Sequence, residues 1–119
     1  MTEPITPKTA LVLIDVYNDF LHPKGKLTAA LAESLQDTDT INHLKQALAG
    51  ARSAKVPVYY SLHQQTHDHK FDGFEHWNDM LKSLKENRAF EEGSFGAEVF
   101  PDLAPKEGEV TISKHWNQR

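Results

Sequence analysis

The stretch TALVLIDV, residues 9–16, decides the fold class of this chain. Residues 10–16 are apolar except for Asp15, and they lack the alternation of a strand with one solvated face. A short, continuous apolar run of this kind predicts a strand covered on both faces, as in a parallel sheet. A buried carboxylate without a partner is costly, so Asp15 either caps the next turn or belongs to a site.

A helix and two more strands are predicted further along the chain. Residues 39–55 have the apolar spacing of an amphipathic helix, with Ile41, Leu44, Leu48 and Ala51 on one face. Residues 56–62 and 109–113 are short apolar segments typical of strands. Strand, helix and strand within about fifty residues predict a right-handed βαβ unit.

The remaining segments complete the order β-α-β-α-β. Residues 27–35 predict a short helix, 63–72 a polar loop and 91–108 a long irregular link. After the loop we expect a helix with one buried face, formed by Phe74, Trp77, Leu81 and Leu84. We therefore expect one α/β domain over residues 1–119, with an open, mostly parallel sheet.

Three polar side chains fall at or just after the predicted carboxyl ends of the strands. They are Asp15, His63 and Lys114. Ligands of open parallel sheets bind beyond these ends. We therefore expect the three residues to converge on one crevice, with Lys114 forming an ion pair with Asp15.

The composition excludes several classes of function. The chain has 119 residues and a net charge of −4, which argues against a nucleic-acid or an anionic membrane partner. It contains no cysteine, which excludes disulfides, thiolate zinc sites and thiol catalysis within this chain. We see neither a signal peptide nor a membrane span, and we expect a cytoplasmic location.

Three motifs in order resemble those of isochorismatase-like cysteine hydrolases, which include the nicotinamidases. They are LIDVYNDF at 13–20, GSFGAEVFPDL at 93–103 and ISKHWN at 112–117. The resemblance implies a doubly wound fold with helices on both faces of the sheet. It covers the N-terminal portion of that fold, because the chain ends after the third strand.

The resemblance also implies a catalytic triad of aspartate, lysine and cysteine. Asp15 would be the general base that takes the thiol proton, and Lys114 would keep this acid ionised. The cysteine, which in the family follows a further strand, would attack a carbonyl or a related carbon. This chain lacks that cysteine, and Tyr17 stands where many members carry glutamine.

Several aromatic side chains are candidates for a substrate pocket, with ordinary core packing as the alternative. The pocket candidates are Tyr17, Phe20, His63, Trp77 and Trp116. Asn18 and Asp19 are expected to shape the turn after the first strand through side-chain to backbone hydrogen bonds.

The loop after the second strand contains His67, Asp68 and His69, which are weak candidates for metal ligands. Some nicotinamidases bind a metal beside the triad, but this loop does not reproduce their ligand pattern. The alternative is a solvated polar loop. We expect no cofactor.

Three functional hypotheses remain from the sequence. The first is a family hydrolase of a small molecule, acting on an amide, imide or vinyl-ether bond, with this chain inactive alone. The second is a truncated pseudoenzyme that binds a small ligand or pairs with a full-length homologue. The third is a metal-assisted hydrolase that uses the His63–His76 loop. A homo-oligomer is a further expectation.

Overall fold

The computed structural model describes residues 8–113 of the chain. Three strands form one parallel sheet in the order β1-β2-β3: β1 (Leu11–Ile14), β2 (Val58–Leu62) and β3 (Val110–Ser113). The register places Ile14 beside Ser61, and Ser61 beside Ile112, so the three strands end nearly level. The predicted α/β class and open parallel sheet are confirmed.

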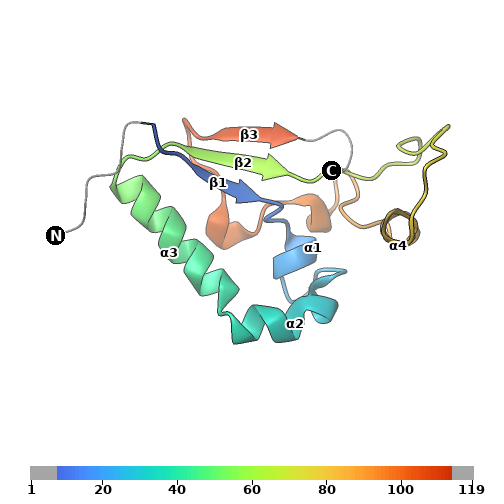
Figure 1. Ribbon diagram of the computed structural model, residues 1–119, viewed down its shortest axis with the longest axis horizontal. Coiled ribbons are helices and arrows are strands. Elements are labelled where there is room, and N and C mark those ends of the chain that lie inside the picture. Colours follow the sequence, from blue (N-terminus) through green and yellow to red (C-terminus); the bar gives the residue numbers. More distant parts are fainter. Residues whose placement is uncertain (1–7, 114–119) are drawn as a thin grey trace.

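The helices connect the strands, and two of them fall close to the ranges that the sequence predicts, 27–35 and 39–55. They are α1 (Asn18–Leu21), α2 (Thr28–Asp37), α3 (Thr40–Ser53) and α4 (Asp79–Glu86), with two short 3₁₀ turns, η1 (Phe95–Ala97) and η2 (Pro101–Leu103). Helix α3 packs on β2 and η2 through its buried residues Leu48 and Ala51. In Figure 1, α2 and α3 lie together on one side of the strands, and α4 stands apart from them. None of the described helices is both long and apolar enough to cross a membrane.

The helix predicted around Phe74 and Trp77 begins later than the sequence pattern indicates. Helix α4 starts at Asp79, because Asn78 takes an extended conformation and its side chain accepts a hydrogen bond from the Leu81 N–H at 2.8 Å. Asparagine is a preferred residue at this capping position. Phe74 and Trp77 therefore lie in the loop before the helix rather than on its face.

The core occupies one face of the sheet. Leu13, Val58, Tyr60 and Leu62 are buried against the helices and the 91–108 segment. Tyr60 is fully buried, and its hydroxyl donates to the Leu103 carbonyl at 2.7 Å. This bond ties η2 beneath the central strand.

The opposite face of the sheet is exposed within residues 8–113, which differs from the expected cover on both faces. Its apolar side chains are Val12, Ile14, Val110 and Ile112, with exposed fractions of 49%, 63%, 44% and 49%. The register aligns Val12, Tyr59 and Val110 in one row, and Ile14, Ser61 and Ile112 in the next. The reason lies in the topology, because both connections between neighbouring strands run in the same direction across the sheet. Right-handed crossovers then place them on the same face.

Candidate functional site

Asp15 marks the end of β1 with an unusual backbone. Its φ angle of 57° lies in the left-handed region, which costs an L-residue about 1–2 kcal/mol. Its N–H still donates to the Ser61 carbonyl at 3.0 Å, and its carbonyl accepts from the Tyr17 N–H at 2.8 Å. The residue is half-buried, and one carboxylate oxygen is shielded from solvent. A strained acid at the carboxyl end of a strand supports its assignment to a site.

Tyr17 is almost fully buried and ties the end of β1 to the end of β2. Its hydroxyl donates to the carbonyl of His63 at 2.6 Å. Burial raises the pKa of Tyr17, hydrogen bonding to Gln65 lowers it, and the charge of Asp15 raises it further. The phenol therefore stays neutral at physiological pH, and its side chain lies in the core.

His63 is half-buried directly after β2, as its position in the sequence predicts. Its Nδ1 lies 2.8 Å from the carbonyl oxygen of Gln64. A carbonyl only accepts, so this contact places the hydrogen on Nδ1 and leaves Nε2 as an acceptor. In this tautomer, Nε2 of His63 can accept a hydrogen bond from a ligand.

The aromatic side chains at this end of the sheet pack around Phe90. The ring centroid of Phe90 lies 4.6 Å from that of His63, 4.8 Å from Phe20 and 5.4 Å from Tyr17. Phe90 is buried and has a φ angle of 54°, which is unfavourable for a bulky residue. We call these four residues the Phe90 cluster. It brings together three of the predicted pocket residues.

Asp19 holds Phe90 in this conformation. Its buried carboxylate accepts the N–H of Phe90 at 2.8 Å through Oδ2 and the N–H of Lys26 at 2.9 Å through Oδ1. Gly96 packs directly on the same carboxylate, and a β-carbon there would overlap it. The predicted side-chain to backbone hydrogen bonds of Asp19 are confirmed, but they extend well beyond the turn. One acid thus joins three separate segments.

A shallow hollow of about 320 Å³ lies beside Asp15. We call it the β1 hollow, and it is lined by Ile14, Asp15, Val16, Phe20, Leu21, Thr40 and Leu44. Its wall is mainly apolar, and Asp15 is its one ionisable lining residue. Such a combination suits a small molecule or a side chain that presents one donor group to the acid.

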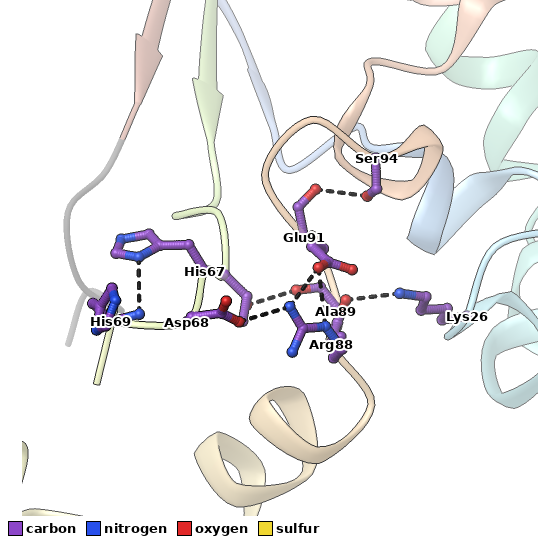
Figure 2. Close-up of polar contacts among 9 residues, drawn as sticks. Lys26, His67, Asp68, His69, Arg88, Ala89, Glu91 and Ser94 are labelled. Carbon is purple, nitrogen blue, oxygen red and sulfur yellow. Dashed lines mark hydrogen bonds and ion pairs between the residues drawn. The ribbon is translucent and has the colours of Figure 1, made fainter. Parts of the chain in front are cut away.

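The histidine loop is organised around Arg88, as Figure 2 shows. The Arg88 guanidinium bonds Asp68 at 3.0 Å and Glu91 at 2.5 Å, and it lowers the pKa of both carboxyl groups. His69 Nδ1 lies 3.0 Å from the Asp72 carboxylate. Within residues 8–113, no three acidic or imidazole groups are arranged to hold a metal ion. Asp68 thus serves as an anchor for the 88–91 segment.

Trp77 lies in a different part of the molecule. Its half-buried ring packs on Phe71 and Phe74, with centroid distances of 5.1 and 5.2 Å, and Lys85 Nζ sits 5.1 Å from its centre. It lines a separate hollow beside α4 and does not line the β1 hollow. Lys114 and Trp116 fall outside the described residues, so the predicted ion pair between Asp15 and Lys114 stays a prediction.

Phe90 was missed by sequence reasoning, although it is central to the site. Little in the sequence marks Phe90 as a site residue, because Ala89 and Phe90 are only two apolar residues in a polar stretch. Both are buried. Asp19 was expected only to shape a turn, because nothing in the local sequence points to a partner 71 residues away.

Comparison with known proteins links this geometry to one family. The family model of the isochorismatase domain matches residues 9–118. No curated protein matches the chain significantly. Similar solved structures include N-carbamoylsarcosine amidase from Thermoplasma acidophilum, at 24% identity and a TM-score of 0.63, over 89% of this chain and 51% of that protein.

Two other solved structures are similar. An isochorismatase family protein from Desulfovibrio vulgaris subsp. vulgaris str. Hildenborough has 24% identity and a TM-score of 0.64, over 89% of this chain and 52% of its own. A cysteine hydrolase from Pseudomonas syringae pv. phaseolicola 1448A has 23% identity and a TM-score of 0.58, over 95% and 49%. At these identities the likeness establishes the fold. The chain spans about half the length of these solved relatives.

Proposed function

Because the chain belongs to the isochorismatase family, we propose that it provides the acid-bearing half of a cysteine-hydrolase site. That site would cleave a small molecule at an amide, imide or vinyl-ether bond. The observation that carries the proposal is Asp15, which is held in a left-handed conformation at the end of β1 and lines the β1 hollow. We also propose that the protein is located in the cytoplasm.

In the proposed reaction on an amide or imide, Asp15 takes the proton of a thiol as the sulfur adds to the carbonyl carbon. It returns that proton to the nitrogen as the carbon–nitrogen bond breaks, and water then hydrolyses the thioester and frees the thiol. Lys114, which follows β3, keeps the acid ionised. The sequence has no cysteine, so the thiol comes from outside these 119 residues. We therefore expect no cysteine-dependent hydrolysis by the purified chain.

The test compares the purified chain with the assembly that it forms in its source. Three probe substrates cover the bond types: nicotinamide, N-carbamoylsarcosine and isochorismate. The purified chain should be inactive, whereas the native assembly should hydrolyse at least one probe. Iodoacetamide and Asp15→Asn should each abolish that activity. Activity that survives both treatments would refute the proposed chemistry.

A second candidate function is a binding module without turnover. The β1 hollow supports this function. It has a volume of about 320 Å³, a mainly apolar wall and one acid, so it can hold a small cationic or hydrogen-bond-donating ligand. Native assemblies that bind a probe with an affinity dependent on Asp15, but never hydrolyse it, would favour this function.

A further inference from the structure

Arg88 has a strained backbone at the end of α4. The Arg88 N–H donates to the Lys85 carbonyl at 3.1 Å, and the Ala89 N–H donates to the Leu84 carbonyl at 3.0 Å. These two bonds form the Schellman arrangement, in which the residue that follows the helix cap is usually glycine, because its φ angle is positive. Arg88 takes this place with a φ angle of 50°. Its side chain therefore has to contribute interactions that offset the strain.

The guanidinium of Arg88 forms ion pairs with two acids. Its Nη2 lies 3.0 Å from the Asp68 carboxylate, and its Nε donates to the Glu91 carboxylate at 3.0 Å. Lys26 approaches from the opposite side, as Figure 2 shows, and its Nζ donates to the Arg88 carbonyl at 2.8 Å. We call residues 88–91 the Arg88 segment. These contacts join it to the loop after β2 and to the segment before α2.

A second strained residue, Phe90, belongs to the Arg88 segment. Its φ angle is 54°, and other parts of the chain hold both of its backbone polar groups. Asp19 accepts the Phe90 N–H at 2.8 Å, and the Thr66 N–H donates to the Phe90 carbonyl at 2.9 Å. The Thr66 hydroxyl also donates to the Ala89 carbonyl at 2.7 Å. A strained backbone persists only where its surroundings hold it, so the conformation of Phe90 depends on these contacts.

Phe90 connects the Arg88 segment with the candidate site. Its ring centroid lies 4.6 Å from that of His63 and 4.8 Å from that of Phe20. Phe20 in turn lines the β1 hollow beside Asp15, whereas Arg88 does not. Packed rings leave little free space, so a movement of the Phe90 backbone displaces the side chains that pack on its ring. Arg88 can therefore act on the wall of the hollow only through Phe90.

We propose that Arg88 is a positioning residue of the candidate site: its ion pairs with Asp68 and Glu91 hold the Arg88 segment closed, and the closed segment keeps Phe90 packed on the wall of the β1 hollow. Without the ion pairs, the segment opens locally while the sheet stays folded. Because local opening takes away the support of the wall, the open form does not bind a ligand in the hollow. The role rests on the proposed function, in which a small molecule binds beside Asp15.

Amide hydrogen exchange, followed by NMR for single residues, measures the local opening. Arg88→Asn removes the charge but keeps a residue that tolerates the left-handed region. In this variant, the Phe90 N–H should exchange about five to ten times faster, which corresponds to the loss of two exposed ion pairs. The Tyr60 N–H on the central strand should keep its rate, because it reports the unfolding of the whole sheet.

Lys55 is the matched control at the end of α3. Its N–H donates to the Arg52 carbonyl at 3.2 Å, the Val56 N–H donates to the Ala51 carbonyl at 2.8 Å, and its φ angle is 58°. Lys55 therefore has the same Schellman bonds and the same backbone conformation as Arg88. It precedes β2 and lies at the other end of the sheet, so Lys55→Asn should leave the exchange of the Phe90 N–H unchanged.

Asp68→Asn and added salt give independent checks. Asp68→Asn breaks one ion pair without a change in the Arg88 segment itself, so it should speed the exchange of the Phe90 N–H about two- to threefold. It also replaces Arg88→Asn if that variant does not fold. Raising the salt from about 0.05 M to about 1 M NaCl should speed the exchange in the wild type, because salt screens exposed ion pairs, but should have little effect in Arg88→Asn.

A ligand tests whether the Arg88 segment supports the hollow. The probe is benzylamine, whose apolar ring and single cationic group match the apolar wall and Asp15. A ligand that binds only the closed form, at about ten times its dissociation constant, should slow the exchange of the Phe90 N–H about tenfold. Benzoate, which Asp15 repels, should have no such effect.

Exchange of the Phe90 N–H that is unchanged in Arg88→Asn, or that Lys55→Asn speeds equally, would overturn the proposal. Equal acceleration at Tyr60, or a Phe90 exchange rate that benzylamine does not alter, would overturn it as well. The hydrolase proposal fails separately. If exchange behaves as expected but the native assembly hydrolyses none of the probe substrates, Arg88 stays a positioning residue of a binding site.

Discussion

Replacing Asp19 by alanine should be among the most damaging single changes to this chain. Its carboxylate is 2% exposed and accepts the backbone N–H groups of Phe90 and Lys26 at 2.8 and 2.9 Å. The Phe90 N–H is buried, so the loss of its acceptor costs about 1–3 kcal/mol. The Lys26 N–H is near solvent, so its loss costs at most about 1 kcal/mol.

Together these terms predict that Asp19→Ala lowers the free energy of unfolding by about 1–4 kcal/mol. The melting temperature should fall by roughly 5–20 °C for a domain of this size. Asp19→Asn keeps one acceptor oxygen and should lose less. The exposed Asp37, at the end of α2, provides the control, and Asp37→Ala should stay within about 0.5 kcal/mol of the wild type. Urea unfolding followed by circular dichroism measures all three variants.

Gly96 gives this reasoning a sharper test, because the three atoms nearest to a β-carbon placed there all belong to the Asp19 carboxylate. Gly96→Ala should therefore destabilise the wild type by about 1–3 kcal/mol. In the Asp19→Ala background it should cost much less, with a coupling energy of about 1–2 kcal/mol. Strictly additive effects, or an Asp19→Ala variant as stable as Asp37→Ala, would refute the account of Asp19 as a clamp.

Three other predictions concern distinct contacts. Arg52 holds Glu109 through two hydrogen bonds of 2.7 and 2.9 Å, and it lowers the pKa of Glu109. The stabilisation of the fold by this ion pair is therefore complete above the ordinary carboxyl pKa. It is lost as the pH falls through the lowered pKa of Glu109. Glu109→Gln should cost about 1 kcal/mol at neutral pH and almost nothing once the pH is below the lowered pKa of Glu109, as thermal melts of both proteins across the acid range will measure; a difference that stays constant with pH would contradict the assignment. Tyr17→Phe removes the 2.6 Å bond to the His63 carbonyl and should cost about 1 kcal/mol in urea unfolding, while an unchanged midpoint would show that this bond contributes nothing. Ile14→Lys should reduce the binding of an apolar fluorescent dye and leave the unfolding free energy within about 0.5 kcal/mol, because Ile14 is 63% exposed; a large loss of stability would mean that Ile14 belongs to the core.

The sequence predicts the elements of this fold well where the signal is local. Helix α3 follows from the spacing of Ile41, Leu44 and Leu48, and β1 follows from the stretch 10–16, which is apolar except for Asp15. The start of α4 was missed because a single asparagine side chain outweighed the apolar spacing of Phe74 and Trp77. Capping depends on one hydrogen bond, which periodicity does not report.

In the candidate site, too, the sequence predicts the local features and misses the contact between distant segments. The sequence places Asp15 and His63 at strand ends, and the parallel topology brings those ends to one edge of the sheet. The Phe90 cluster depends on Asp19, which bonds a backbone group 71 residues away. No local pattern encodes a contact across that separation.

The sequence by itself determined the family, the order of the strands and of the longer helices, and the acid that follows β1, because each depends on motifs or spacings within a few residues. The tertiary structure alone decided that Asp19 is a clamp and that Val12 and Ile14 lie on an exposed face of the sheet. Both depend on which segments fold over the strands, and an apolar side chain has the same sequence signature whether or not another element covers it.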